Sequence, residues 1–203
     1  MPNLSGPPLR KIGFLGGTFD PIHNGHKFIS EEAIKEFQLD QLLLCPAYQA
    51  PLRNHPPLFT AEQRLEMVRL VAKKNPKISI FDFEINQKQT SYTWQTIQEV
   101  KKLYPDAEIL LLIGYDQFVR LSKWKFLKEL SLAVHFIVFA RDHLHPSHPS
   151  FPELSFTLMN NSLFSASSTS IRDHLHRGDS IKGMVPDDVY TYLQTKHLLT
   201  YSN

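Results

Sequence analysis

The sequence has almost no cysteine, little excess charge and no long hydrophobic run. Cys45 is the single cysteine among 203 residues, which excludes an internal disulfide and a zinc site built on cysteines. The 22 Lys and Arg residues against 20 Asp and Glu give a net charge of +2, far from the dense basic field of proteins that bind nucleic-acid backbones. We therefore expect no nucleic-acid partner, whereas a small anionic ligand in one cleft stays compatible with this composition.

The apolar stretches are short as well. The longest, 109–113 and 136–140, fall far short of the roughly 20 residues that span a bilayer. Residues 1–10 contain three prolines and no apolar core of a secretory signal. We expect a cytoplasmic protein with no membrane partner. Its length and its 42% of apolar residues predict a single domain with one self-sufficient core, over about 11–199.

Short apolar runs alternate with amphipathic segments along the chain. The runs that predict strands cover 11–15, 41–45, 78–83, 108–113 and 134–140, with 155–159 as a weaker candidate. The segments with helical spacing cover 26–37, 61–73, 92–103 and about 116–121. Because two parallel strands need a crossover between them, this order predicts an α/β fold with a doubly wound, mainly parallel sheet. Ligands of such a sheet bind at the carboxyl ends of its strands.

A run rich in glycine and histidine lies between the first predicted strand and the first predicted helix: Gly16-Gly17-Thr18-Phe19-Asp20-Pro21-Ile22-His23-Asn24-Gly25-His26. Gly16 and Gly17 have no Cβ where the strand ends, so a phosphate chain can approach the backbone N–H groups closely. His23 and His26 are three residues apart, so in a first helical turn both rings would project from one face toward the same polyphosphate. The positive end of the helix dipole suits a phosphoryl group that gains negative charge during in-line displacement. The alternative is a glycine-rich turn in which Asp20 caps the helix and the histidines face solvent.

A second candidate phosphate element, Ser167-Ser168-Thr169-Ser170-Ile171-Arg172, lies near the other end of the chain. Hydroxyl and N–H groups at a helix start bind anions, and Arg172 in that first turn would add a cationic fork. The alternative is a capping box, because Ser170 and Asp173 have its spacing. Two such elements, far apart in sequence, can converge on one triphosphate.

Two further groups of residues lie between these elements. Gly114 ends the most apolar predicted strand, where a ligand can approach closely, and the Asp116 carboxylate can accept hydrogen bonds from ribose hydroxyls or cap a helix. Tyr92 and Thr93 open a predicted helix whose N–H groups can bind a carboxylate, although a plain Ser or Thr cap explains them too. Three histidines within 141–152, at positions 143, 145 and 148, are more typical of a solvent loop than of a metal site.

The first run matches the Gly-x-Phe-Asp-x-x-His-x-Gly-His pattern of the nucleotidylyltransferase superfamily, and the second resembles its Ser-Ser-Thr-x-Ile-Arg signature. Over most of its length the sequence resembles the bacterial nicotinate-nucleotide adenylyltransferases, and His23 in place of Thr argues against the phosphopantetheine branch. The resemblance implies a Rossmann-like fold. It also implies transfer of AMP from ATP to nicotinate mononucleotide, giving deamido-NAD and pyrophosphate in NAD biosynthesis.

The resemblance also implies roles for the candidate residues. It assigns catalysis at the α-phosphate to His23 and His26. It assigns ATP binding to Gly16, Gly17, Thr18, Phe19, Gly114, Asp116, Ser168, Thr169 and Arg172. Substrate binding falls to Arg53, Tyr92, Thr93 and Trp124. Trp124 would stack on the pyridine ring, although a lone Trp on a helix more often packs in a core. Arg53 stands where the family usually has Lys.

We expect a magnesium ion that bridges ATP phosphates and takes its ligands mostly from substrate and water, with no protein metal ligand assigned. Two other activities stay open: another small-molecule nucleotidylyltransferase, such as a pantetheine-phosphate adenylyltransferase or a cytidylyltransferase, and a non-catalytic nucleotide sensor. The sequence leaves undecided the preference for the acid over the amide mononucleotide and the formation of a homo-oligomer.

Overall fold

The centre of the protein is a six-stranded sheet, parallel throughout, with the strand order β3-β2-β1-β4-β5-β6. The computed structural model describes residues 10–51, 55–139, 151, 153–159 and 167–199. Its strands are β1 (Lys11–Gly17), β2 (Gln41–Pro46), β3 (Ile78–Ile80), β4 (Glu108–Gly114), β5 (His135–Phe139) and β6 (Phe156–Met159). The doubly wound parallel sheet predicted from the sequence is confirmed, including the weaker candidate that became β6.

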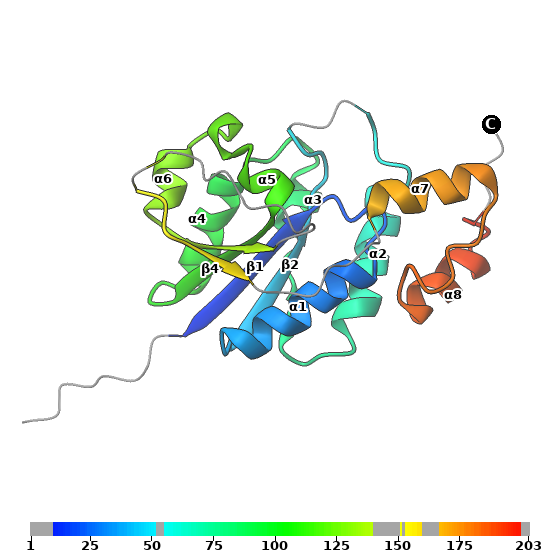
Figure 1. Ribbon diagram of the computed structural model, residues 1–203, viewed down its shortest axis with the longest axis horizontal. Helices are drawn as coiled ribbons and strands as arrows, with labels where there is room; N and C mark the ends of the chain where they lie inside the picture. The colour runs from blue at the N-terminus through cyan, green and yellow to red at the C-terminus, as the bar shows by residue number, and fades with distance from the viewer. Residues whose placement is uncertain (1–9, 52–54, 140–150, 152, 160–166, 200–203) are drawn as a thin grey trace, which may run out of the picture.

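Helices cover both faces of this sheet (Figure 1). They are α1 (Asn24–Glu36), α2 (Ala61–Ala72), α3 (Phe83–Gln87), α4 (Thr93–Leu103), α5 (Tyr115–Phe118), the 3₁₀ helix η1 (Leu121–Lys123), α6 (Leu127–Ser131), α7 (Ser168–Arg177) and α8 (Asp187–Thr195). Figure 1 shows α4, α5 and α6 on one side of the sheet, with α1, α2, α7 and α8 on the other. No helix in the described ranges combines the length and the apolar character that a membrane span requires.

Strands β1, β2, β4 and β5 each contribute to two hydrophobic cores because their side chains alternate between the faces of the sheet. In β4, Leu110 and Leu112 join the core under α1, α2, α7 and α8, whereas Ile109, Leu111 and Ile113 join the core under α4, α5 and α6. Burial on both sides explains why β4 reads as an almost continuous apolar run instead of an alternating one.

The structure differs from the sequence prediction in three respects beyond shifts of one or two residues at the ends of elements. The strand expected over 78–83 ends at Ile80, since only Ile78–Ile80 pairs with β2, and the apolar residue Phe83 instead begins α3. The helix expected over about 116–121 is broken into α5 and η1. The amphipathic spacing also did not single out α6 and α8. Short apolar runs do not separate a strand from a short buried helix by periodicity alone.

A buried carboxyl joins the end of β2 to α3 and α4. Thr96 Oγ1 of α4 donates to Glu84 Oε1 of α3 at 2.6 Å, and the buried Cys45 of β2 neighbours the same carboxyl. Burial raises the pKa of Glu84, and the hydrogen bond from Thr96 opposes that shift. Burial, and then the neighbouring Glu84, raise the pKa of the Cys45 thiol well above its usual value. These contacts hold α3 and α4 against the sheet, but burying the Glu84 carboxylate lowers the stability of the fold.

Glu84→Gln tests that cost. When folding raises the pKa of a carboxyl, the folded protein loses stability as the pH rises from the pKa of that carboxyl in the unfolded state to its pKa in the folded state. The reason is that the carboxyl ionises first in the unfolded chain. We therefore expect the free energy of unfolding of Glu84→Gln to exceed that of the wild type above pH 7, by a margin that shrinks toward pH 4. Urea denaturation across this pH range measures it. The control is Glu62→Gln, an exposed carboxyl with a lowered pKa, whose substitution moves stability in the opposite sense. A margin that does not change with pH contradicts the interpretation.

Candidate functional site

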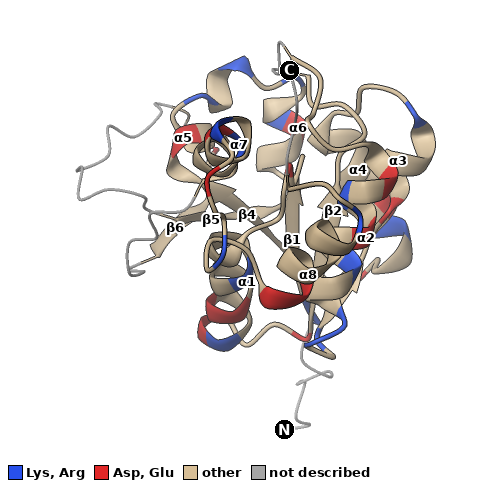
Figure 2. Ribbon diagram, turned by 90° about the vertical axis from the view of Figure 1, so that its right-hand side faces the viewer, with Lys and Arg blue, Asp and Glu red and all other residues tan. Residues whose placement is uncertain are grey.

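The sheet opens at its centre, between β1 and β4. The pairing of β1 with β2 continues to Gly17↔Pro46, whereas its pairing with β4 runs only from Lys11↔Glu108 to Phe14↔Leu111. The last residues of β1 and β4 therefore lie on either side of an opening, at the position where the strand order reverses direction. Ligands of doubly wound sheets bind at this switch point, beyond the carboxyl ends of the strands. Figures 1 and 2 place α5 and α7 at this end of the sheet.

His23 and His26 meet at the start of α1, but not as two residues of one helical turn. His23 is the N-cap, with extended backbone, and α1 begins at Asn24. The two residues form a reciprocal capping box: His23 Nδ1 accepts from Gly25 N–H at 3.1 Å, and His26 Nδ1 accepts from His23 N–H at 3.3 Å. Their rings lie 3.8 Å apart between centroids. The predicted closeness is thus confirmed, whereas the predicted reason for it was wrong.

This capping box also determines where the imidazole protons lie. In each ring Nδ1 is an acceptor, so a neutral ring carries its proton on Nε2. Both histidines are thereby set as Nε2–H donors. His23 is 3% exposed, whereas His26 is half-buried and stands with its ring against the edge of Phe19, 5.0 Å between centroids. His26 is the more accessible donor.

The glycine-rich segment before α1 is partly open. Gly16 is exposed, and a Cβ on Gly17 would meet nothing nearer than the Phe19 ring at 3.4 Å, an ordinary contact. Packing within the chain therefore does not by itself require glycine at position 17, which fits a backbone that a ligand approaches. We call residues 16–26, the candidate phosphate-binding residues before and at the start of α1, the phosphate segment. The Phe19 ring is 2% exposed and belongs to the core, so only the backbone of Phe19 is available to a ligand of this segment.

The second element packs directly on the first. Helix α7 begins at Ser168, its N-cap Ser167 accepts from Ser170 N–H at 3.0 Å, and Ser168 Oγ donates to the carbonyl of Pro21 at 3.1 Å. The N-cap is therefore Ser167, so the capping box at Ser170 and Asp173 considered from the sequence does not form. Arg172 is the fifth residue of α7 and not part of its first turn. Its Nη1 nevertheless reaches back to donate to the Asp20 carbonyl at 2.9 Å.

Asp20 is the centre of this junction, and sequence reasoning gave it no role beyond that of a cap. Its side chain is 0% exposed, and it does not cap α1. Asp20 Oδ1 accepts from Phe59 N–H at 2.9 Å, Oδ2 accepts from Leu58 N–H at 3.0 Å, and Oδ2 lies 3.6 Å from Arg172 Nη1. One carboxylate thus joins the phosphate segment, the chain before α2 and the start of α7.

Arg64 is a second buried organiser that the sequence analysis missed. It is 1% exposed and donates to four carbonyls, those of Phe59 (3.2 Å), Thr18 (2.6 Å), Ala47 (2.6 Å) and Tyr48 (3.1 Å). The two ends of the loop expected over 47–58 are therefore fixed to the phosphate segment. A charged residue on the apolar face of α2, in register with Val68 and Val71, was the available signal.

Residues assigned to the substrate gather on the other side of the opening. Tyr92 is the N-cap of α4 and makes no side-chain cap, and Thr93 is the first helical residue, so the plain Ser or Thr cap does not occur. Lys125 Nζ donates to Tyr92 Oη at 2.9 Å and lies 4.5 Å from the centroid of its ring. Trp124, the residue before Lys125, is half-buried against the core under α4 and α6. The start of α4 and the end of η1 thus face each other.

At the end of β4, Gly114 is the N-cap of α5, and the exposed Asp116 lies in the first turn without capping it. Asp116 Oδ2 accepts from Gln117 Nε2 at 2.9 Å. Two sets of predicted residues lie outside the described ranges: Arg53, and the histidines at 143, 145 and 148. Within those ranges no group of three His, Cys, Asp or Glu side chains is placed to hold a metal ion.

Arg64→Met tests the organising role of the buried arginine. Removing the guanidinium leaves four carbonyl groups without their charged donor, which we expect to lower the free energy of unfolding by about 3–5 kcal/mol. Chemical denaturation measures this change. The control is Arg69→Met on the same helix, where the exposed ion pair with Glu66 at 3.4 Å contributes at most about 1 kcal/mol. Equal losses in the two variants would rule out the assignment.

The chain is similar to known proteins over most of its length. The family model of cytidylyltransferase-like proteins matches residues 14–174. A probable nicotinate-nucleotide adenylyltransferase of Opitutus terrae is 35% identical over 193 residues, which covers 93% of this chain and 97% of that protein. One from Exiguobacterium sibiricum is 36% identical over 189 residues, with 93% and 98% covered.

Among solved structures, the nicotinic acid mononucleotide adenylyltransferase of Plasmodium falciparum complexed with NaAD has a TM-score of 0.79. It is 20% identical, with 94% of this chain and 97% of that chain covered, and so shows the shared fold. On the strength of the sequence matches, the chain belongs to the cytidylyltransferase-like family and, within it, to the nicotinate-nucleotide adenylyltransferases.

Proposed function

We propose that the protein transfers the AMP moiety of ATP to the 5′-phosphate of nicotinate mononucleotide, releasing pyrophosphate. The observation that carries this proposal is the contact between Arg172 and Asp20, two residues 152 positions apart in the sequence, which brings the two candidate phosphate elements to one end of the sheet. The activity in the names of the relatives agrees with it.

The reaction needs no side-chain nucleophile. A phosphate oxygen of the mononucleotide attacks the α-phosphorus of ATP, the bond from that phosphorus to the bridging oxygen breaks, and pyrophosphate carries away the electron pair. The protein contributes orientation of both substrates and stabilisation of the negative charge that gathers on the α-phosphoryl oxygens. We assign the His26 Nε2–H, which the capping hydrogen bond orients, as the donor to an α-phosphoryl oxygen. The His23 ring lies beside the His26 ring and is assigned to the same region.

We assign binding of the departing pyrophosphate to the start of α7. Arg172 Nη2 donates to Thr169 Oγ1 at 3.1 Å, so the Thr169 hydroxyl proton points away from the guanidinium and we assign it as a donor to an anion. The Ser168 hydroxyl already donates to Pro21, so its contribution to a phosphate is its backbone N–H at the helix start. We assign backbone N–H groups of the segment before α1 to the phosphates, at Gly16, Gly17 and Thr18. The ribose is assigned to Gly114 and Asp116.

A magnesium ion fits this arrangement as a companion of ATP. Since the described residues hold no cluster of three potential ligands, phosphate oxygens and water would supply most of its coordination. When bound, it neutralises part of the triphosphate charge.

The pyridine end of the mononucleotide is assigned to the start of α4 and the end of η1. Trp124 offers a ring for stacking, and the first N–H groups of α4, at Thr93, are suited to a carboxylate. Lys125, held against Tyr92, adds positive charge on the same side. This favours the acid over the neutral amide.

A pyrophosphate-release assay tests the function directly. With ATP and nicotinate mononucleotide we expect turnover, with nicotinamide mononucleotide less, and with phosphopantetheine none. Activity with phosphopantetheine alone, or ATP binding without pyrophosphate release for any acceptor, would replace the proposal with one of the two other activities.

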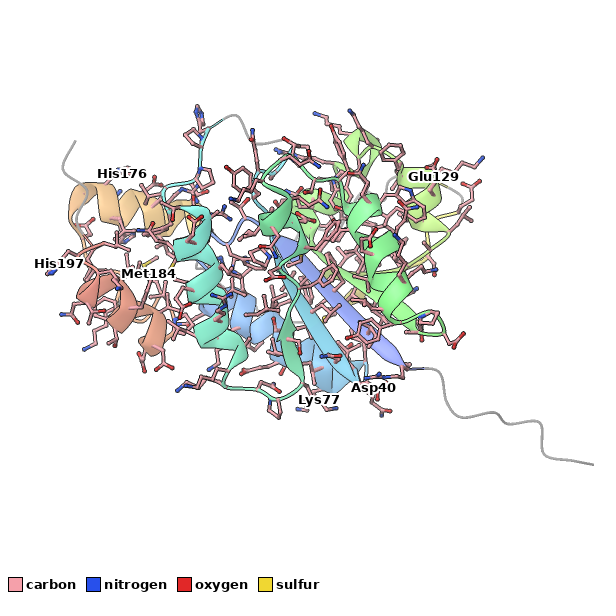
Figure 3. The ribbon with its side chains drawn as sticks, turned by 180° about the vertical axis from the view of Figure 1, so that it is seen from behind. Asp40, Lys77, Glu129, His176, Met184 and His197 are labelled. Carbon is pink, nitrogen blue, oxygen red and sulfur yellow. The ribbon has the colours of Figure 1, made fainter. Side chains whose placement is uncertain are left out.

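His26→Ala should leave the fold intact and lower kcat by roughly 10² to 10³, the cost of losing one preorganised donor. Steady-state turnover and thermal unfolding measure the two effects. The control is His176→Ala, an exposed histidine on the same molecule (Figure 3), which should change turnover less than twofold. Turnover near the wild-type value in folded His26→Ala refutes the assignment.

Trp124→Ala should raise KM for nicotinate mononucleotide about fivefold and leave KM for ATP almost unchanged, because a stacking contact contributes about 1 kcal/mol. Trp124→Phe, which keeps a ring, should restore most of the affinity. If both variants change the two KM values alike, Trp124 acts through packing of the core and not through the substrate.

A further inference from the structure

The bonds of the Asp20 side chain all go to other parts of the protein. Its side chain is 0% exposed, so no oxygen of the carboxylate is open to a ligand. Two backbone N–H groups, of Leu58 and Phe59, donate to its two oxygens, and the Arg172 guanidinium lies 3.6 Å from Oδ2. A side chain placed in this way can affect substrate only through a neighbour.

That neighbour is Arg172, whose orientation depends on Asp20 at two points. Nη1 donates to the Asp20 carbonyl at 2.9 Å while it faces the Asp20 carboxylate, and Nη2 donates to Thr169 at 3.1 Å. An arginine side chain loses several rotatable degrees of freedom when it binds phosphate, unless it is already held. With 21% of its side chain exposed, Arg172 is held and still accessible.

We propose that Asp20 is a positioning residue that acts through Arg172: its buried carboxylate pre-orients the guanidinium for the β- and γ-phosphates and the departing pyrophosphate. The inference rests on the proposed function for its catalytic consequence, but the binding of pyrophosphate tests it without turnover. An ionised carboxylate accepts from all the donors around it. An asparagine in its place would turn an NH₂ group toward either an N–H group or the guanidinium, and would also remove the charge.

The experiment is a double-mutant cycle on Asp20→Asn and Arg172→Gln, read by calorimetric binding of inorganic pyrophosphate and by kcat/KM for ATP. We expect each single variant to weaken pyrophosphate binding at least tenfold, and the double variant to bind no more weakly than Arg172→Gln alone, since Asp20 then has no guanidinium to orient. If the two effects multiply, Asp20 acts on the fold and not through Arg172, and the proposal is overturned. It is also overturned if Arg172→Gln leaves pyrophosphate binding unchanged.

Asp179→Asn is the matched control. Asp179 forms an exposed ion pair, at 2.7 Å, with Arg177, which lies in α7 like Arg172. Asp179→Asn should change pyrophosphate binding less than twofold. Should Asp20→Asn fail to fold, Arg172→Lys tests the same proposal: a single ammonium keeps the charge but cannot reproduce the fork to Asp20 and Thr169, so binding should still fall at least fivefold. Wild-type affinity in Arg172→Lys overturns the proposal. A wild type that binds pyrophosphate with the expected coupling but makes no dinucleotide would overturn the proposed function alone.

Discussion

The buried carboxylate of Asp20 accepts hydrogen bonds from the chain before α2 and faces the guanidinium of Arg172 from α7. Three segments that are distant in sequence meet at this point, directly beyond the end of β1. Without this carboxylate, the N–H groups of Leu58 and Phe59 would lose this acceptor, at a cost of about 1–3 kcal/mol for each buried group, and the guanidinium would lose its counter-charge. The geometry of the phosphate end of the site therefore depends on one oxygen pair that substrate does not reach.

Around that junction, the sheet and the helix caps set the remaining geometry. The strand order makes β1 and β4 the strands that part at their carboxyl ends, which opens the site between a glycine-rich turn and the end of β4. The reciprocal cap at the start of α1 orients the two imidazoles and consumes the Gly25 N–H, while the Asn24 N–H donates to Met184 at 3.0 Å. What α1 offers an anion is thus its dipole and the ring N–H of the half-buried His26, more than open backbone amides.

Much of the fold could be predicted from the sequence because its signals are local. The strands and the longer helices follow from apolar periodicity, and the opening at the strand ends follows from the parallel topology. What failed was also local: Phe81 and Phe83 are apolar enough for a strand, but the edge strand β3 pairs only as far as Ile80 before the chain turns into α3. The apolar pattern alone does not show where the strand ends and the helix begins.

The site was predictable as a set of residues and less so as a set of contacts. The histidine pair and Ser168, Thr169 and Arg172 do lie at one end of the sheet, yet His23 arrives there as a cap, and Ser168 is engaged by Pro21. Asp20 and Arg64 escaped notice because their partners lie 38, 46 and 152 residues away, and no spacing rule connects them. Long-range contacts of a buried charge become visible only once the chain is folded.

We propose that the start of α1 and the start of α7 hold one triphosphate between them. The decisive experiment is a crystal structure of the protein with a non-hydrolysable ATP analogue and nicotinate mononucleotide. We expect triphosphate oxygens within hydrogen-bonding distance of both His26 Nε2 and the Arg172 guanidinium, with the Asp20 contacts intact. A triphosphate bound elsewhere, with neither of these side chains touching it, would show that the two helix starts do not share one ligand.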